Sequence, residues 1–171
     1  VESPPFIWKS GSTATLCIPA IFFSWCGKAL DMKIPLIRSE DALNQAACRL
    51  LRIIGVEVSK VSSTLGPEQE FFLVDRDHFE GRMDLKLVGR TLFGALPAKG
   101  QEFEDHYFSA IPERVSAFIQ EVEVRAIELG IPLKTRHSEV APHQYELAPL
   151  FEKSSQAINH NLLLMQILTQ V

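Results

Sequence analysis

Cysteine is scarce in this sequence of 171 residues, and its three cysteines form no Cys-x-x-Cys pair. Cys17, Cys26 and Cys48 are too few and too widely spaced to build a disulfide framework. Buried free thiols in a reducing compartment are the ordinary interpretation of such a pattern. We therefore predict a cytoplasmic location, and an organelle stays open as the alternative.

Long apolar runs and clusters of basic residues are also missing. The most apolar stretch, residues 16–26 (LCIPAIFFSWC), is far shorter than the roughly 20 residues of a membrane span, and Pro19 interrupts it. The formal net charge is −4, the pI is near 5.7, and the basic residues are scattered. Because nucleic acids and anionic membranes favour a basic patch, we expect neither as a partner.

The remaining composition is that of an ordinary globular protein. Hydrophobic residues make up 46% and charged residues 22% of the chain, which is enough apolar material for a core. The length fits one domain or a piece of a larger one. The sequence starts at Val1 and ends inside a helical pattern, NLLLMQILTQV, so we expect a fragment that is truncated at both ends.

Runs of apolar, β-branched and aromatic residues predict several strands. The short link around Pro142 and His143 favours antiparallel pairing of the two strands that flank it. Helices and antiparallel strands in this order indicate an α+β fold rather than a parallel sheet. The strands are expected at 13–23, 69–75, 133–141 and 144–150, with a short one at 84–88.

Apolar residues at helical spacing predict three helices. We expect the first to begin at Ser39 as N-cap, after a loop at 29–39, and to end before Gly55. The second opens at Pro112 and stops at the GIP of 130–132. The third is capped by Ser154 or Ser155 and is buried nearly all round at 162–168, and residues 76–107 form a long irregular segment.

Two of the expected strands carry glutamates in apolar surroundings. Glu68 and Glu70 lie in GPEQEFFLVD, and because successive side chains of a strand alternate, both share one face. Glu139 and Glu146 lie in KTRHSEVAPHQYELAP, on either side of the predicted turn. If these strands share a sheet, four carboxylates converge and repel one another unless positive charge is supplied.

Divalent cations that prefer oxygen ligands, Mg²⁺ or Mn²⁺, would supply that charge. Two cations on four carboxylates would leave positions for phosphate oxygens and water. The alternative is that each glutamate is solvated on an exposed face. A two-carboxylate glycosidase is a further possibility, in which one pair would flank a sugar groove.

The motif GPEQEFFLVD followed by RHSEVAPHQYELAP resembles the catalytic domain of glutamine synthetase, with EDHYF between the two. TLCIPAIFFSWCGKALDMKIPLIRS and GRTLFGALPAKGQEFEDHYFSAIPERV resemble the type III class, so the resemblance covers nearly the whole chain. It implies a curved antiparallel sheet with flanking helices, which forms part of a funnel between adjacent subunits of a homo-oligomer. Residues 1–35 would then be a strand and loop leading into the catalytic domain, and residues 36–171 its N-terminal part.

The resemblance also implies an activity: glutamate, ammonia and ATP would give glutamine through a γ-glutamyl phosphate. By position, Glu70, Glu139 and Glu146 match ligands of the cation near the glutamate, and Glu68 matches a ligand of the cation near the ATP phosphates. Tyr107 matches the tyrosine that borders the ammonium pocket. His137 matches a histidine that the family often places just behind the metal ligands.

The sequence departs from the family pattern at one turn, where His143 replaces the usual glycine. The family's further metal ligands, its glutamate-binding arginine and most ATP contacts would lie beyond residue 171. We therefore expect these 171 residues to be inactive on their own. A ligase or guanidino kinase of the same fold with another acceptor, or a non-catalytic structural relative, are the alternatives.

Overall fold

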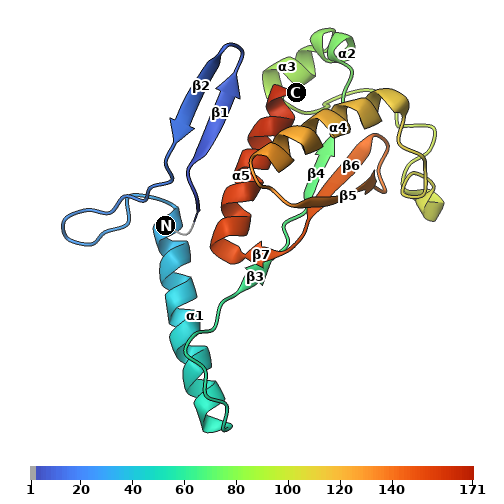
Figure 1. The fold of residues 1–171 in the computed structure, drawn as a ribbon. Coiled ribbons are helices and arrows are strands. Elements are labelled where there is room, and N and C mark those ends of the chain that lie inside the picture. Colours follow the sequence, from blue (N-terminus) through green and yellow to red (C-terminus); the bar gives the residue numbers. More distant parts are fainter. Residues whose placement is uncertain (1–2) are drawn as a thin grey trace.

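The computed structural model describes residues 3–171, which form helices and small antiparallel sheets (Figure 1). The predicted α+β fold class is confirmed. The strands are β1 (Phe6–Ser10), β2 (Thr13–Cys17), β3 (Thr64–Leu65), β4 (Gln69–Phe72), β5 (Leu133–Ser138), β6 (Gln144–Pro149) and β7 (Glu152–Lys153). The helices are α1 (Lys33–Ile53), α2 (Arg76–Glu80), α3 (Met83–Val88), α4 (Glu113–Glu128) and α5 (Ser154–Gln170), with a 3-10 turn at Glu102–Glu104.

Three strands, in the order β4-β6-β5, form the sheet that carries the predicted glutamates. Both pairings are antiparallel, and the short link between β5 and β6 predicts the pairing of these two strands. Tyr145 and Leu147 of β6 point to one face and are buried there, while Glu146 between them points to the other. The alternation of β6 therefore separates an apolar face from a carboxylate face.

Helices α4 and α5 cover the apolar face of this sheet (Figure 1). Apolar residues recur every three or four positions along α4 and form one buried stripe, which confirms the predicted helix after Pro112. Gly130, with φ +81°, ends that helix and turns the chain into β5. The buried core comprises Val115, Ile119, Val122, Ala126, Ile131, Tyr145, Leu147, Leu164 and Ile167.

The N-terminal part differs from the prediction. β1 and β2 form a hairpin that the sequence pattern did not indicate, and the expected strand 13–23 ends at Cys17. The remainder of the expected strand, residues 18–23, forms one isolated bridge, between Phe23 and Ala29. Pro19 lacks an N–H for a ladder, and the aromatic side chains beyond it stay exposed, so their strand propensity is not supported by packing.

Helix α1 begins at Lys33, six residues before the predicted N-cap Ser39. Pro35 lies in the first turn, where its missing N–H costs no intrahelical hydrogen bond. The Lys33 N–H donates to Asp31 Oδ1 at 2.8 Å, which satisfies one of the free amides at this end. The helix ends just before Gly55, as predicted, and its C-terminal end extends away from the remainder of the chain (Figure 1).

Two further predictions are wrong. Residues 83–88 form helix α3 instead of a strand, because Gly89 adopts φ +71° and donates to the Leu85 carbonyl, which closes a helical turn. Helix α5 starts at Ser154 with Lys153 at the N-cap position, so neither serine side chain caps it. Instead, the Ser155 N–H donates to Glu40 Oε1 of α1 at 3.2 Å.

The C-terminal helix is also less buried than its apolar sequence indicates. Leu164 and Ile167 belong to the core, whereas Leu162 and Met165 are about half exposed. Among residues 3–171, no helix combines the length and hydropathy that a membrane crossing requires.

Candidate metal centre

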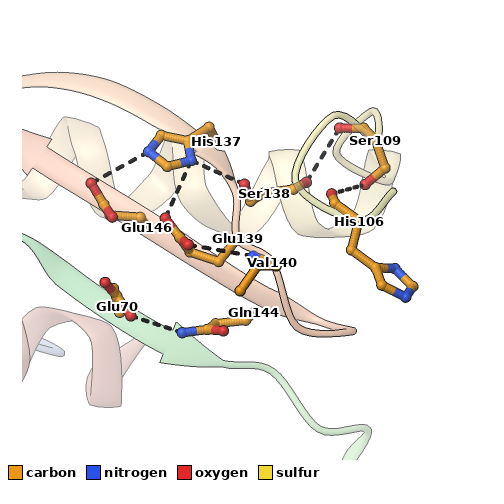
Figure 2. Close-up of polar contacts among 9 residues, drawn as sticks. All are labelled: Glu70, His106, Ser109, His137, Ser138, Glu139, Val140, Gln144 and Glu146. Carbon is orange, nitrogen blue, oxygen red and sulfur yellow. Dashed lines mark hydrogen bonds and ion pairs between the residues drawn. The ribbon is translucent and has the colours of Figure 1, made fainter. Parts of the chain in front are cut away.

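A row of three polar side chains crosses the carboxylate face of the sheet. Glu70 of β4 is the direct partner of Glu146 of β6, and Glu146 is the direct partner of His137 of β5. Directly paired residues share a face of the sheet. The predicted convergence of the two glutamate-bearing strands is therefore confirmed, with Glu146 at the centre (Figure 2).

Glu68 and Glu139 extend this row from the strand ends. Glu68 comes immediately before β4, and Glu139 immediately after β5. The ligand atoms of Glu68, Glu70 and Glu146 lie within 4.8 Å of one another, and those of His137, Glu139 and Glu146 do likewise. All four glutamates singled out in the sequence thus form one cluster joined through Glu146.

His137 lies between two of these carboxylates (Figure 2). Its Nε2 is 3.3 Å from Glu146 Oε1, and its Nδ1 is 3.6 Å from Glu139 Oε1. Nδ1 also lies 3.0 Å from the backbone oxygen of Ser138. The imidazole is therefore in position to orient both Glu139 and Glu146.

Burial and mutual repulsion shift the acid–base properties of the cluster. The Glu146 side chain is only 7% exposed and that of Glu139 12%, whereas Glu68 and Glu70 are exposed. Burial, a hydrogen bond with the Glu139 carboxyl and the charge of Glu68 raise the pKa of Glu146 to about 6. The hydrogen bond to Ser138 and the charges of Glu146 and Glu139 raise the pKa of His137.

Arg136 does not neutralise this cluster, although it is the sequence neighbour of His137. Its Nη1 donates to Glu123 Oε2 of α4 at 2.7 Å, on the helix-covered side of the sheet. The positive charge that the four carboxylates need must therefore come from a source other than Arg136.

The segment before α4 brings Tyr107 to the site. The Tyr107 ring lies 5.4 Å from the His137 ring, centroid to centroid, and the side chain is 42% exposed. Ser138 Oγ donates to the Ser109 carbonyl at 3.3 Å, and Ser109 Oγ donates to the His106 carbonyl at 2.7 Å (Figure 2). These bonds fasten the Tyr107 segment to the end of β5.

A tight turn joins β5 to β6 and sets the spacing of the glutamates on either side. His143, where we noted the departure from glycine, has φ +56°, a left-handed conformation that histidine tolerates better than most residues. The Glu139 N–H donates to the Gln144 carbonyl at 2.8 Å, and the Gln144 N–H donates to the Ala141 carbonyl at 3.2 Å. These two bonds close the turn despite the non-glycine residue.

Two polar neighbours of the cluster escaped the sequence analysis. Gln144 donates from Nε2 to Glu70 Oε2 at 2.8 Å, and buried Ser138 holds the Tyr107 segment. In the sequence, only their positions indicated these two residues. Gln144, for example, lies two residues before Glu146 on a strand, so the side chains of Gln144 and Glu146 share one face.

The donor set suits a hard divalent cation. It consists of carboxylate oxygens with one imidazole nitrogen, and hard divalent cations prefer oxygen ligands. Burial first, and then the neighbouring carboxyl groups of Glu139 and Glu68, raise the pKa of Glu146, so a bound cation would stabilise the ionised form by its charge. A hollow of about 1310 Å³ between β1 and the helices α4 and α5 is lined by none of the cluster residues.

Fold and site together define a class of protein: an α+β domain whose antiparallel sheet gathers four glutamates that could hold a divalent cation. Residues 49–171 match the family model described as glutamine synthetase, catalytic domain, and residues 1–39 match the model of the glutamine synthetase type III N terminal. The chain therefore belongs to the glutamine synthetase family, in its type III class.

Curated relatives agree with this assignment over nearly the whole chain. A type-3 glutamine synthetase of Dictyostelium discoideum is 52% identical over 170 residues, which cover 99% of this chain and 23% of the relative. A glutamine synthetase of Bacteroides fragilis (strain YCH46) is 47% identical over 171 residues, covering 100% of this chain and 23% of the relative. One of Butyrivibrio fibrisolvens is 48% identical over 164 residues, covering 95% and 23%. The chain thus spans 23% of the length of the curated relatives that it matches.

Proposed function

We propose that the protein containing this chain ligates ammonia to the side-chain carboxylate of glutamate at the expense of ATP and so makes glutamine. The observation that carries this proposal is the row of Glu70, Glu146 and His137 across three strands, extended by Glu68 and Glu139. Family membership supports the same activity.

The reaction needs two displacements. An oxygen of the glutamate γ-carboxylate attacks the γ-phosphorus of ATP, and the bond to ADP breaks. Ammonia, formed when ammonium releases a proton, then attacks the carbonyl carbon and displaces phosphate. Phosphoryl transfer depends on positioning and charge neutralisation more than on covalent help from the protein. Divalent cations, when bound, neutralise phosphate charge and orient the attacking carboxylate.

We assign the following roles to the residues of this chain. Glu70, Glu139 and Glu146 hold the cation near the glutamate, and Glu68 contributes to the cation near the ATP phosphates. The two ring nitrogens of His137 lie beside Glu139 and Glu146, so the imidazole helps to orient both carboxylates. Burial of Glu139 and Glu146 limits water around these ligands.

Tyr107 is the residue we assign to the ammonium pocket. Its exposed ring lies against His137, so it borders the carboxylate cluster from the side of the 3-10 segment. An ammonium ion between an aromatic face and nearby carboxylates gains attraction from both.

Assembly, domain division and location are part of the proposal. We infer a homo-oligomer in which neighbouring subunits complete the site, with residues 1–35 leading into the catalytic domain that starts at 36. This boundary falls inside helix α1. A cytoplasmic location is supported by the free state of Cys17, Cys26 and Cys48.

The test is a direct assay of the intact protein with glutamate, ammonium, ATP and Mg²⁺, in which glutamine and phosphate are measured together. We expect equal amounts of both from the wild type and neither from Glu146→Gln. Glu57→Gln, which changes an exposed glutamate between α1 and β3, is the matched control and should remain active.

Two outcomes would overturn the proposal. Phosphoryl transfer to a guanidino compound, without glutamine formation, would show an enzyme of the same fold with another acceptor. Tight Mn²⁺ binding without turnover of either acceptor would show a non-catalytic relative.

A further inference from the structure

We propose that Gln144 is a positioning residue that holds Glu70 in the orientation required for cation binding. This inference rests on the proposed function, because it assigns Glu70 to the metal site. Gln144 itself is not expected to touch the cation or the substrate.

Strand register places Gln144 where it can serve this purpose. Gln144 pairs directly with Phe72 in the β4–β6 ladder, and Glu70 pairs with Glu146. Gln144 and Glu70 are therefore diagonal neighbours on the carboxylate face, a separation that long side chains can bridge. The bond from Gln144 Nε2 to Glu70 Oε2 is 2.8 Å long (Figure 2).

Glu70 needs such a partner more than Glu139 and Glu146 do. Its side chain is exposed, whereas Glu139 and Glu146 are confined by burial and by His137. An exposed glutamate samples several rotamers, and binding a cation would cost that freedom. A hydrogen bond from a neighbouring strand restricts the Glu70 side chain before the cation binds, so less conformational entropy is lost on binding.

The backbone of Gln144 adds a second constraint. The backbone carbonyl of Gln144 accepts a hydrogen bond of 2.8 Å from the Glu139 N–H, across the turn between β5 and β6. One residue thus links Glu70 through its side chain with Glu139 through its main chain. Gln144 therefore fixes the positions of Glu70 and Glu139 relative to each other, although the two are far apart in the sequence.

The chemical nature of the amide also matters. Lysine or arginine at this position could hold Glu70 as well, but its positive charge would oppose a divalent cation. A carboxylate would add one more repelling negative charge to the cluster. The neutral amide donates one hydrogen bond and leaves the second Glu70 oxygen available as an acceptor.

The experiment measures Mn²⁺ binding to the intact protein by calorimetry and by electron paramagnetic resonance. Gln144→Met keeps the length of the side chain but removes the donor, and we expect about 10-fold weaker Mn²⁺ binding. Raising the Mn²⁺ concentration should restore kcat, because the ligands themselves remain. The thermal stability of the metal-free variant should match that of the wild type.

Gln156→Met is the matched control. Gln156 Nε2 donates to Glu152 Oε1 at 2.9 Å, which is the same kind of amide–carboxylate bond outside the cluster. We expect this variant to bind Mn²⁺ as the wild type does. A loss equal to that of Gln144→Met would mean that any such bond matters, and it would overturn the assignment.

A double-mutant cycle with Glu70→Ala tests whether Gln144 acts through Glu70. In the Glu70→Ala background, adding Gln144→Met should change the Mn²⁺ affinity by less than about twofold. A further large loss would refute the positioning role, as would wild-type affinity in the single variant. If the single variant binds weakly but even the wild type makes no glutamine, the proposed function fails and the role of Gln144 toward the cation stands.

Discussion

Replacing Glu146 with glutamine tests two properties of the carboxylate cluster: the destabilisation that its negative charge causes and its ability to bind cations. Glutamine has nearly the same shape, and its amide can donate to Glu139, whose carboxyl is hydrogen-bonded to Glu146 in the wild type. The substitution removes one negative charge from the most buried position of the cluster. We therefore expect a more stable metal-free protein that no longer binds divalent cations tightly.

The pKa of Glu146 sets the size of the gain. A rise from 4.5 to about 6 corresponds to about 2 kcal/mol of unfavourable ionisation in the folded state. Between these two values the folded state binds more protons than the unfolded state, so stability falls as pH rises through this interval. The cost is absent below pH 4.5 and complete above about pH 6.

His137 acts in the same direction. Its pKa is raised in the folded state, so the stability that it contributes in the protonated form is lost as pH rises through the folded value. The metal-free wild type should consequently be more stable at pH 5 than at pH 8. Glu146→Gln should flatten this dependence, because one of the two groups no longer titrates.

The assay is thermal unfolding of the EDTA-treated intact protein at pH 5 and pH 8, with and without added Mn²⁺. At pH 8 we expect the apparent Tm of Glu146→Gln to exceed that of the wild type by a few degrees. Added Mn²⁺ should raise the Tm of the wild type and leave the variant unchanged. A variant no more stable than the wild type at pH 8 would refute the idea that Glu146 is held against repulsion.

Three further predictions concern other residues of the chain. Glu139→Gln should lower Mn²⁺ affinity and glutamine formation by orders of magnitude while circular dichroism stays unchanged, because an amide oxygen is a weaker ligand than a carboxylate. Asp84→Asn should speed proteolysis near residues 82–93, since Asp84 accepts from Arg82 at 2.8 and 2.6 Å and from the Leu92 N–H at 3.0 Å. His143→Val should destabilise the turn by about 1–2 kcal/mol in chemical denaturation, whereas His143→Gly should be nearly neutral because glycine adopts φ +56° without strain.

The placement of the glutamates could be predicted because it follows from two simple rules. Side-chain alternation puts Glu68 with Glu70 on one face, and a short link between two extended segments requires an antiparallel pair. The pairing of β4 with β6 could not be derived from these rules. A slip of one residue in the β4–β6 register would turn Glu70 to the face covered by helices. The register is fixed only because the apolar residues of both strands must all face the core.

The errors of prediction lie where local propensity and packing disagree. Residues 18–23 have strand-like composition, but no neighbouring strand covers them beyond one bridge in the described part of the chain. Residues 83–88 look equally apolar, yet Gly89 and the Arg82–Asp84 bond favour a helical turn there. In helix α1 the sequence pattern predicts a loop around Pro35, although the first turn of a helix accepts proline.

The position of Glu146 argues that selection for stability alone does not explain this sheet. A sheet covered by helices on one face normally presents solvated polar residues on the other, and glutamates there would cost little. Here, however, Glu146 on the opposite face is only 6% exposed, with His137 and Glu139 beside it, and its pKa is raised. An apolar residue at this position would remove the repulsion, whereas a cation would turn the same repulsion into binding energy. Strain of this kind, confined to residues that could share a ligand, is typical of functional sites.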